Sequence, residues 1–323
     1  MAGLSGGHGV SIGRLTADDV DGAAALSRTI GWNQTVADWG RLVTTPGSEV
    51  FNARSGGDVV GTASLVRYGA SLGWLGMVIV HPDLRGRGLG AALVDHVLAA
   101  WDAAPGAAPG ALLGLDATEF GAPLYLRRGF TPVATIDRWL GPTLTTTDAS
   151  RSATGLGGVS VRSAGADDRS PITDFDLLHA GVDRSALLHR LVAESVAGPV
   201  QAGAAAVRVF VAERAAELVG YAAVRPGRER PHIGPLVAAD DSVVTALLDA
   251  VTDSSATGAY LDAVRDPHRT RLLTARGFEL ARTLQRMARV PRSSATQAER
   301  DLAATAPPLS AEALMAAMGF EWG

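Results

Sequence analysis

The sequence predicts an α/β fold in which helices cover a mixed sheet, and it predicts two tandem copies of that fold. Its 323 residues suit two domains of about 150 residues each. Five landmarks of the first half recur in the same order in the second half, at offsets between 146 and 159 residues. Within each half, stretches with strand periodicity alternate with stretches with helix periodicity. These observations predict an internal duplication whose insertions lie in loops.

The repeated landmarks are short and occur in matching order. They include Val-Ser-Ile or Val-Ser-Val at 10–12 and 159–161, Leu-Asp-Ala at 115–117 and 261–263, and Gly-Phe at 129–130 and 277–278. The predicted organisation is a first domain at 9–142, a linker rich in Ser, Thr, Gly and Ala at 143–158, a second domain at 159–290, and a polar tail at 291–323 with a short helix over 310–318.

Local patterns predict the elements of the first copy in order along the chain. An opening strand over 10–15 precedes a helix that Thr16 or Asp18 can cap. Residues 58–67 alternate between apolar and polar as in a half-buried strand. The continuous apolar run over 74–80 ends at a His-Pro pair and predicts a short central strand.

The elements after this central strand are a helix, a strand and a second helix. Apolar residues recur every four positions from Leu89 to Trp101, which predicts an amphipathic helix. A strand over 111–116 follows, and a short helix over 119–128 ends at Gly129.

The composition excludes several classes of function. A net charge of −4 leaves no basic excess to neutralise phosphates, so we expect no nucleic-acid partner. There is no cysteine, and all 29 basic residues are arginine, which excludes thiolate and lysine nucleophiles. The seven histidines lack metal-ligand spacing, so we expect no metal. Without a signal peptide or a long apolar stretch, we expect a cytoplasmic protein with no membrane segment.

The segment from Leu75 to Gly90 is the predicted site of ligand binding. A buried strand runs into a glycine-rich turn that opens a helix. The N–H groups at a helix start and the helix dipole favour an anion. Glycines allow the backbone to approach a pyrophosphate closely, and Arg85 and Arg87 can bind phosphate oxygens.

Here the sequence resembles the GNAT N-acetyltransferases, whose coenzyme signature is Arg/Gln-x-x-Gly-x-Gly/Ala. Arg85, Gly88 and Gly90 fill the specified positions. A later segment is similar to the family's Tyr-x-x-x-Gly-Phe ending, with Tyr125 and Phe130 in place. The two motifs agree in order and spacing over most of the first domain, and the resemblance implies two tandem GNAT-fold domains.

The resemblance implies acetyl-CoA as cosubstrate and indicates how it is held. The turn would bind the pyrophosphate, and a free backbone N–H of the buried strand would polarise the thioester carbonyl. The coenzyme-binding residues that we expect are Val78, Ile79, Val80, Arg85, Gly86, Arg87, Gly88, Leu89 and Gly90.

The same turn also fits the dinucleotide fingerprint Gly-x-Gly-x-x-Gly/Ala, from Gly86 to Ala91. That fingerprint directly follows its strand near a domain start, with an acidic residue about 20 positions on. Here four residues separate Val80 from Arg85, and the first acidic residue that ends a later strand is Asp116. We therefore favour the coenzyme A interpretation over a dinucleotide site and over a simple helix-capping turn.

Candidate residues for catalysis and for the acceptor come from the same resemblance. Tyr125 lies where the family often places a general acid that protonates the leaving thiolate, and its alternative role is packing. Trp32 and Asn33 fall in the segment similar to the acceptor-facing loop, and Glu119 lies near the expected cleft. No general base stands out, because a surface role is favoured for both Glu119 and His81.

The second copy lacks this chemistry. Its central strand over 232–238 is followed by Asp240 and Asp241, without the glycines and arginines of the first copy. Like charges there would repel a pyrophosphate. The position of Tyr125 corresponds to Leu273, which cannot donate a proton. The chain is therefore similar to tandem GNAT proteins with an intact first domain and a degenerate second domain.

The sequence thus predicts an N-acetyltransferase of the acyltransferase class. The acetyl group would pass from acetyl-CoA to an amine of a small molecule or peptide by direct attack in a ternary complex. The alternative is a non-catalytic acetyl-CoA sensor or interaction protein. Homodimer formation stays open.

Overall fold

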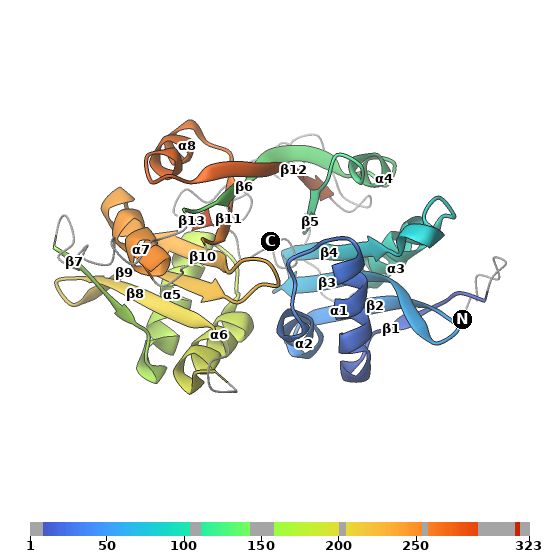
Figure 1. Ribbon diagram of the computed structural model, residues 1–323, viewed down its shortest axis with the longest axis horizontal. Coiled ribbons are helices and arrows are strands. Elements are labelled where there is room, and N and C mark those ends of the chain that lie inside the picture. Colours follow the sequence, from blue (N-terminus) through green and yellow to red (C-terminus); the bar gives the residue numbers. More distant parts are fainter. Residues whose placement is uncertain are drawn as a thin grey trace.

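The computed structural model describes residues 9–103, 111–142, 158–199, 205–253, 258–289 and 314–316. In these residues the chain forms two α/β halves that stand side by side and are bridged by long strands (Figure 1). The predicted fold class, two tandem α/β domains with a mixed sheet, is confirmed. None of the described helices combines the length and the apolar character needed to cross a membrane.

The first half contains the strands and helices that the patterns predicted, with the last helix shorter than expected. In chain order they are β1 (Ser11–Arg14), α1 (Val20–Thr29), α2 (Val36–Thr44), β2 (Ser48–Ser55), β3 (Asp58–Tyr68), β4 (Leu72–Val80), α3 (Leu89–Asp102), β5 (Leu112–Ala117), α4 (Ala122–Leu126) and β6 (Thr131–Leu140).

The second half repeats this order. Its elements are β7 (Val159–Ser163), α5 (Arg169–Ala180), α6 (Ser185–Ala197), β8 (Arg208–Arg214), β9 (Glu217–Arg225), β10 (His232–Ala238), α7 (Asp241–Asp253), β11 (Tyr260–Val264), α8 (Pro267–Thr274), β12 (Glu279–Arg289) and β13 (Leu314–Ala316). Short 3₁₀ turns precede α1, α3 and α5, at Ala17–Asp19, Pro82–Leu84 and Ala166–Asp168.

Alternate side chains of the central strands pack on opposite faces of the sheet, as the pleat requires. Val66 and Trp74 belong to the buried cluster that includes α1 and α2. Leu65 and Leu75 point to the other face and pack with Leu93 of α3. The first of these clusters also contains apolar side chains of α5, α6 and β8, so the two halves share a buried core.

The described strands form one sheet in the order β1-β2-β3-β4-β5-β12-β6-β11-β10-β9-β8-β7. The last strand of each copy has therefore left its own half. β12 pairs antiparallel with β5 of the first half, and β6 pairs antiparallel with β11 of the second half. These two exchanged strands also pair with each other and form the bridge at the top of Figure 1.

Equivalent buried ion pairs join each exchanged strand to its host. Arg286 of β12 donates to both oxygens of Asp116 on β5, with N–O distances of 2.9 Å. Arg138 of β6 donates to both oxygens of Asp262 on β11 at 2.7 Å. Both aspartates belong to the repeated Leu-Asp-Ala landmark, so the contact is duplicated with the fold. All four side chains are 10% exposed or less.

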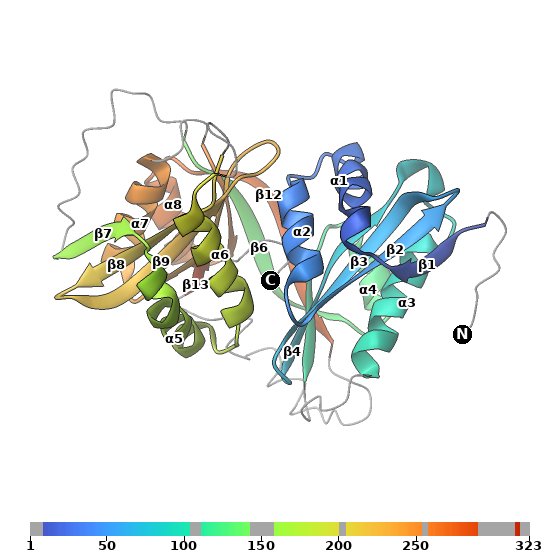
Figure 2. The ribbon, with the colours of Figure 1, turned by 90° about the horizontal axis from the view of Figure 1, so that it is seen from below.

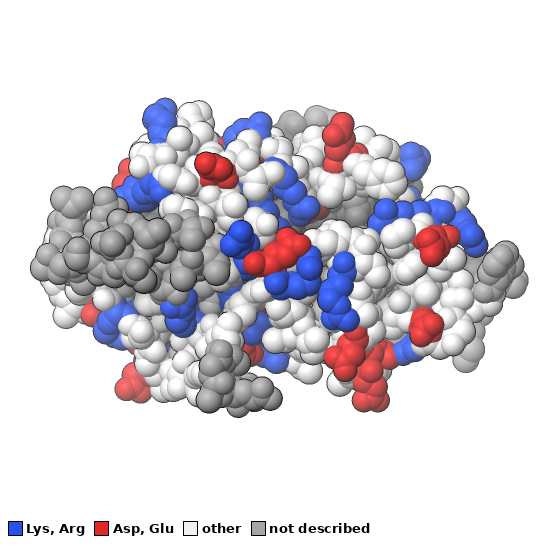
Figure 3. Space-filling model, in the orientation of Figure 1, with Lys and Arg blue, Asp and Glu red and all other residues white. Residues whose placement is uncertain are grey.

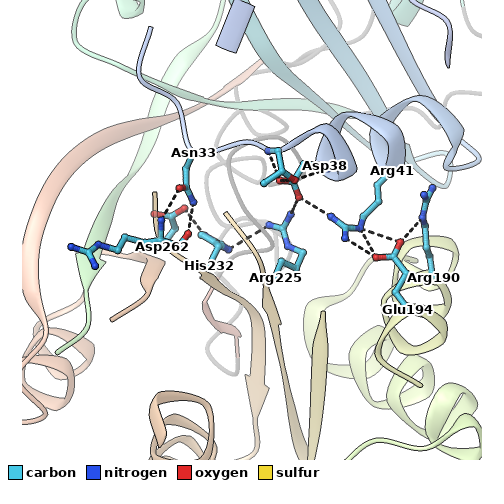
Figure 4. Close-up of polar contacts among 10 residues, drawn as sticks. Asn33, Asp38, Arg41, Arg190, Glu194, Arg225, His232 and Asp262 are labelled. Atoms are coloured by element: carbon cyan, nitrogen blue, oxygen red, sulfur yellow. Dashed lines mark hydrogen bonds and ion pairs between the residues drawn. The ribbon is translucent and has the colours of Figure 1, made fainter. Parts of the chain in front are cut away.

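A second set of polar contacts lies along the seam, which is the boundary between the two halves. Helices α2 and α6 face each other there (Figure 2), and Arg41 of α2 pairs with Glu194 of α6 at 2.6 Å. Asp38 of α2 accepts from Arg41 at 2.8 Å and from Arg225 of β9 at 2.9 Å (Figure 4). Burial raises the pKa of Glu194, but the hydrogen bonds and charge of Arg41 outweigh it and lower that pKa.

The predicted terminal helix over 310–318 is wrong at Leu314–Ala316, which form strand β13. The other residues of that stretch lie outside the described part of the chain. β10 pairs with β11 only through His232 and Ile233, and β13 pairs with β10 further along, at Leu236 and Val237. Backbone groups of a buried strand must find partners, and this requirement outweighs the local helix propensity of an Ala-, Leu- and Met-rich segment.

We predict that the exchanged strands hold the two halves together as one folding unit. Arg286→Ala should lower the free energy of unfolding by about 3–5 kcal/mol, because the Asp116 carboxylate stays buried without its partner. Urea denaturation measures this loss. The control Arg214→Ala removes an exposed pair with Asp240 and should cost about 1 kcal/mol or less.

The double variant Asp116→Leu/Arg286→Met replaces the pair by apolar groups and should recover most of the lost stability. A loss for Arg286→Ala no larger than that for Arg214→Ala would contradict the prediction.

Candidate active site

A slot opens where β4 and β5 diverge. The two strands pair in parallel only from Leu72–Trp74 to Leu112–Gly114. Beyond Trp74, residues 75–80 of β4 line a cavity of about 670 Å³, here called the first cavity. The backbone groups on this edge of β4 have no strand partner on β5 and can hydrogen-bond a ligand.

A bulge in β4 shapes the wall of the slot. The register with β3 shifts between Thr62 and Ser64, opposite Met77 and Val78. Met77 takes a φ of +50°, which is left-handed and strained for a residue with a long side chain. Its carbonyl accepts a 2.8 Å hydrogen bond from the Thr62 hydroxyl, which helps to hold the bulge. Such bulges redirect the backbone of a strand and occur often beside functional sites.

The glycine-rich turn lies at one end of the slot, before α3. Gly86 and Gly88 have φ values of +74° and +81°, a conformation that residues with a Cβ rarely adopt. Gly88 is the N-cap of α3, and no side chain caps this helix. No heavy atom lies within 4 Å of a Cβ built on either glycine. The start of α3 lies at the cavity, since Gly88, Leu89 and Gly90 line it.

The structure brings almost all the predicted coenzyme-binding residues to the first cavity. Its lining includes Val78, Ile79, Val80, Arg85, Gly86, Gly88, Leu89 and Gly90. Arg87 is exposed and does not line the cavity. The Nε of Arg85 donates to the carbonyl of Val80 at 3.2 Å, which keeps this side chain against the end of β4.

Tyr125 lies on α4 and lines the same cavity. The residue is 8% exposed, and its ring packs edge-to-face on Phe130 with centroids 5.9 Å apart. Burial raises the pKa of the Tyr125 phenol above its ordinary value, and the nearby charge of Arg128 offsets this only in part. The phenol therefore stays protonated across the physiological range.

The three predicted acceptor residues separate in the structure. Trp32, in the loop between α1 and α2, lines the first cavity. Asn33 lies at the seam (Figure 4). Its amide nitrogen donates to the Arg230 carbonyl at 2.8 Å, and its amide oxygen accepts from the Glu229 N–H at 2.9 Å. Glu119 is exposed and does not line the cavity. Asn33 thus has a structural partner in the β9–β10 loop.

Sequence reasoning missed several residues that line the first cavity. Phe120, the residue after Glu119, is 85% exposed and lines the cavity. Arg282 and Leu284 come from β12 of the second copy. An exposed aromatic next to the Tyr-x-x-x-Gly-Phe segment is a weak sequence signal. The two β12 residues carry no such signal, because only the strand exchange places them in the first half.

The equivalent turn of the second half is occupied by the chain's own carboxylate. Asp240 accepts from the N–H groups of Ser242 at 2.9 Å and Val243 at 3.1 Å, and so caps α7. It also pairs with Arg214 at 2.9 Å, and these contacts lower the pKa of Asp240. Beside it, β13 pairs with β10 where β10 has left β11.

Family models match both halves of the chain. Residues 46–132 match a model described as an acetyltransferase (GNAT) domain, and residues 172–300 match a second model with the same description. Together the two matches cover about two thirds of the chain. Both halves belong to the GNAT acetyltransferase family, and the chain is a tandem GNAT protein. No curated protein sequence matches it.

Solved structures share the tandem fold at low sequence identity. A protein of Pyrococcus horikoshii designated an acetyltransferase superposes with a TM-score of 0.73 at 16% identity, over 100% of this chain and 99% of the other. A tandem GNAT protein from the clavulanic acid biosynthesis pathway gives 0.60 at 19% identity, over 87% and 98%. A GCN5-related N-acetyltransferase from Sphaerobacter thermophilus gives 0.62 at 14%, over 87% and 95%. These likenesses concern the fold.

We predict that Gly88→Glu abolishes binding of coenzyme A to this GNAT protein, whereas the wild-type chain binds one equivalent. A side chain at φ +81° is strained, and the added carboxylate repels phosphate at the start of α3. Isothermal calorimetry measures both quantities.

The matched control is Gly158→Glu, at a glycine with φ +72° and similar open space that does not line the cavity. It should bind coenzyme A as the wild type does. Two equivalents in the wild type, or normal binding by Gly88→Glu, would refute the assignment of the turn.

Proposed function

We propose that the first half transfers an acetyl group from acetyl-CoA to an amine, and that the second half binds no coenzyme. The observation that carries this proposal is the slot between β4 and β5, which connects the glycine turn to Tyr125 in one cavity. GNAT acetyltransferases use acetyl-CoA as cosubstrate, and both halves match this family.

The residues around the slot suit the parts of this coenzyme. The uncapped start of α3 and the Arg85 guanidinium would hold the pyrophosphate, as helix N-termini and arginines do for phosphates. The pantetheine arm would lie along β4 and hydrogen-bond its unpaired edge, in the manner of an added strand. A backbone N–H of Val78, Ile79 or Val80 would polarise the thioester carbonyl.

The chemistry requires little from side chains. The neutral amine attacks the acetyl carbonyl carbon, so that a C–N bond forms and the C–S bond breaks. An α-amine with a pKa near 8 is about a tenth neutral at pH 7, so water can take the proton lost from nitrogen. Tyr125 would donate its phenolic proton to the departing sulfur and recover one from solvent.

The second half would act as scaffold and cleft wall. In the second half, Asp240 accepts from the N–H groups equivalent to those that would bind phosphate in the first half, and its charge would oppose an anion. The buried pair between Arg286 and Asp116 holds β12 beside β5, and Arg282 and Leu284 of β12 line the first cavity. A second half that binds no coenzyme but still supplies β12 to the first half would have a structural role.

The proposal predicts turnover of amines. A panel of small amines, amino acids and peptides, assayed for thiol release from acetyl-CoA, should give acetylated product with at least one class. Coenzyme binding without turnover of any amine would favour a non-catalytic sensor and would overturn the enzymatic proposal.

A sharper prediction concerns Tyr125. Tyr125→Phe should lower kcat by about 10²–10⁴, the usual contribution of general acid catalysis, while coenzyme affinity stays nearly unchanged. Because the raised pKa keeps the phenol protonated, the basic limb of the pH–rate profile should not shift between wild type and variant. Steady-state kinetics between pH 6 and 10 tests both points.

Tyr68→Phe is the control, since Tyr68 is a buried phenol of the same half that does not line the cavity. It should keep the wild-type kcat. A Tyr125→Phe variant within about threefold of wild type, well below the range for acid catalysis, would make Tyr125 a packing residue.

A further inference from the structure

One side of the first cavity is apolar and combines residues of both copies of the fold. The apolar side chains that line it are Ile30, Trp32, Met77, Phe120 and Leu284. Met77 belongs to the buried cluster that includes α1 and α2, and Ile30 and Trp32 pack against that cluster. Helix α3 packs on the other face of the sheet. We call this part of the lining the acceptor side.

Leu284 faces the same side of the sheet as α1 and α2. Residues two apart on a strand point to one face. Arg286, two residues after Leu284 on β12, holds its guanidinium 4.7 Å from the centre of the Trp74 ring, and Trp74 belongs to the cluster of α1 and α2. Because β12 pairs with β5 as far as the last residue of β5, Leu284 lies next to the segment that leads into Phe120. The second copy thus supplies part of the acceptor side.

The polar side chains near the acceptor side already have partners within the chain. Asp116 is the one carboxylate among the described residues that line the first cavity, and Arg286 binds both of its oxygens. The Thr118 hydroxyl accepts from the Gly121 N–H at 3.1 Å. Arg282 also has interactions within the chain. A ligand on this side would therefore meet mainly apolar surface, apart from the backbone of β4 and the phenol on α4.

A smaller cavity of about 190 Å³ adjoins the acceptor side at the seam and has a different character. On the face shown in Figure 3, charged side chains of both signs gather over the middle of the molecule, around the seam. A bulge in β12 sets Arg282 opposite Arg138 in the wall of this smaller cavity. Arg138 binds Asp262 through two hydrogen bonds, and Glu229 pairs with Arg228. Because these charges are paired within the chain, we place the acceptor on the apolar side of the first cavity.

We propose that the acceptor is an amine whose remaining part is uncharged and apolar, and that this apolar part packs on the acceptor side against Trp32 and Phe120. The inference rests on the proposed acetyltransfer, because it names the acceptor class of the same site. The amine nitrogen must reach the acetyl carbonyl beside β4, so its substituent has to lie against the walls next to β4. Burial of an apolar group against these walls is favourable. An apolar ligand would also cover the Phe120 ring, which is 85% exposed.

The apolar surroundings also act on the proton of the acceptor amine. An alkyl amine such as that of lysine has a pKa of about 10.4 in water and is mostly charged at neutral pH. Apolar surroundings disfavour the charged form and lower the pKa of an amine. The charge of Asp116, on the described lining, is already balanced by Arg286. The acceptor side therefore favours the neutral amine, which is the nucleophile, and opposes an acceptor with a second positive charge.

The test uses three amines of nearly equal size that differ only at the end away from the nitrogen. Hexylamine ends in a methyl group, 5-aminopentanol in a hydroxyl and 1,5-diaminopentane in a second amine. The wild type should acetylate hexylamine with a kcat/KM at least about tenfold higher than 5-aminopentanol and should use the diamine least, because an unpaired hydroxyl is costly to bury and a charge more so. Thiol release at saturating acetyl-CoA measures these values. Equal values for the three amines, or the reverse order, would overturn the inference.

Two variants assign the preference to the acceptor side. Trp32→Ala and Phe120→Ala change a half-buried and an exposed side chain, so both variants should fold. Each should lower kcat/KM for hexylamine about tenfold more than kcat/KM for methylamine, which has no chain to pack. The controls Leu126→Ala on α4 and Leu280→Ala on β12 remove side chains that are 50% and 52% exposed and line neither cavity, and they should keep the wild-type preference. Equal losses for the two amines in Trp32→Ala and Phe120→Ala would overturn the assignment.

A binding measurement separates this inference from the proposed function. N-hexylacetamide is a neutral amide with the same apolar chain, and calorimetry with the protein saturated in coenzyme A requires no turnover. Binding that weakens about tenfold or more in Trp32→Ala, with no acetylation of any amine, would overturn the proposed function and leave the apolar site standing. Acetylation of amines without a preference for hexylamine would overturn only the apolar site. Neither binding nor turnover would overturn both.

Discussion

Two buried ion pairs, Arg138–Asp262 and Arg286–Asp116, hold both copies of this chain in one sheet. Each pair joins the last strand of one copy to the fifth strand of the other, and each aspartate belongs to the same repeated landmark. The pairs are bidentate, and an unpaired charge at either position would be costly to bury. Each buried charge therefore needs its partner from the other copy, and each half depends on the other to complete its part of the sheet.

This exchange has a direct consequence for the candidate active site. The coenzyme side of the first cavity is built from β4, the glycine turn and α4, all of the first copy. The other end includes Arg282 and Leu284, which the second copy supplies through β12. The second copy, in which Asp240 caps the start of α7, thus supplies part of the wall of the cavity in the first copy.

The two copies differ most where an anion would bind. The start of α3 is uncapped and glycine-rich, whereas Asp240 caps α7 with its own carboxylate. The slot between β4 and β5 opens into the first cavity. In the second copy, β13 pairs with β10 at the equivalent place, where β10 and β11 separate. In both cases backbone groups that could hydrogen-bond a ligand in the first copy have partners from the chain in the second.

The sequence by itself determined the duplicated α/β fold, the order of its elements and the glycine turn before α3, because hydrophobic periodicity and glycine spacing are local signals. Tyr125 and Trp32, which the sequence singled out, both line the first cavity. The strand exchange, the bulge that sets Arg282 opposite Arg138, and strand β13 were decided by tertiary structure. Asn33 became a seam contact for the same reason. Strand partners far apart in the chain leave no local pattern, since backbone pairing and buried charge are satisfied only once the whole sheet has formed.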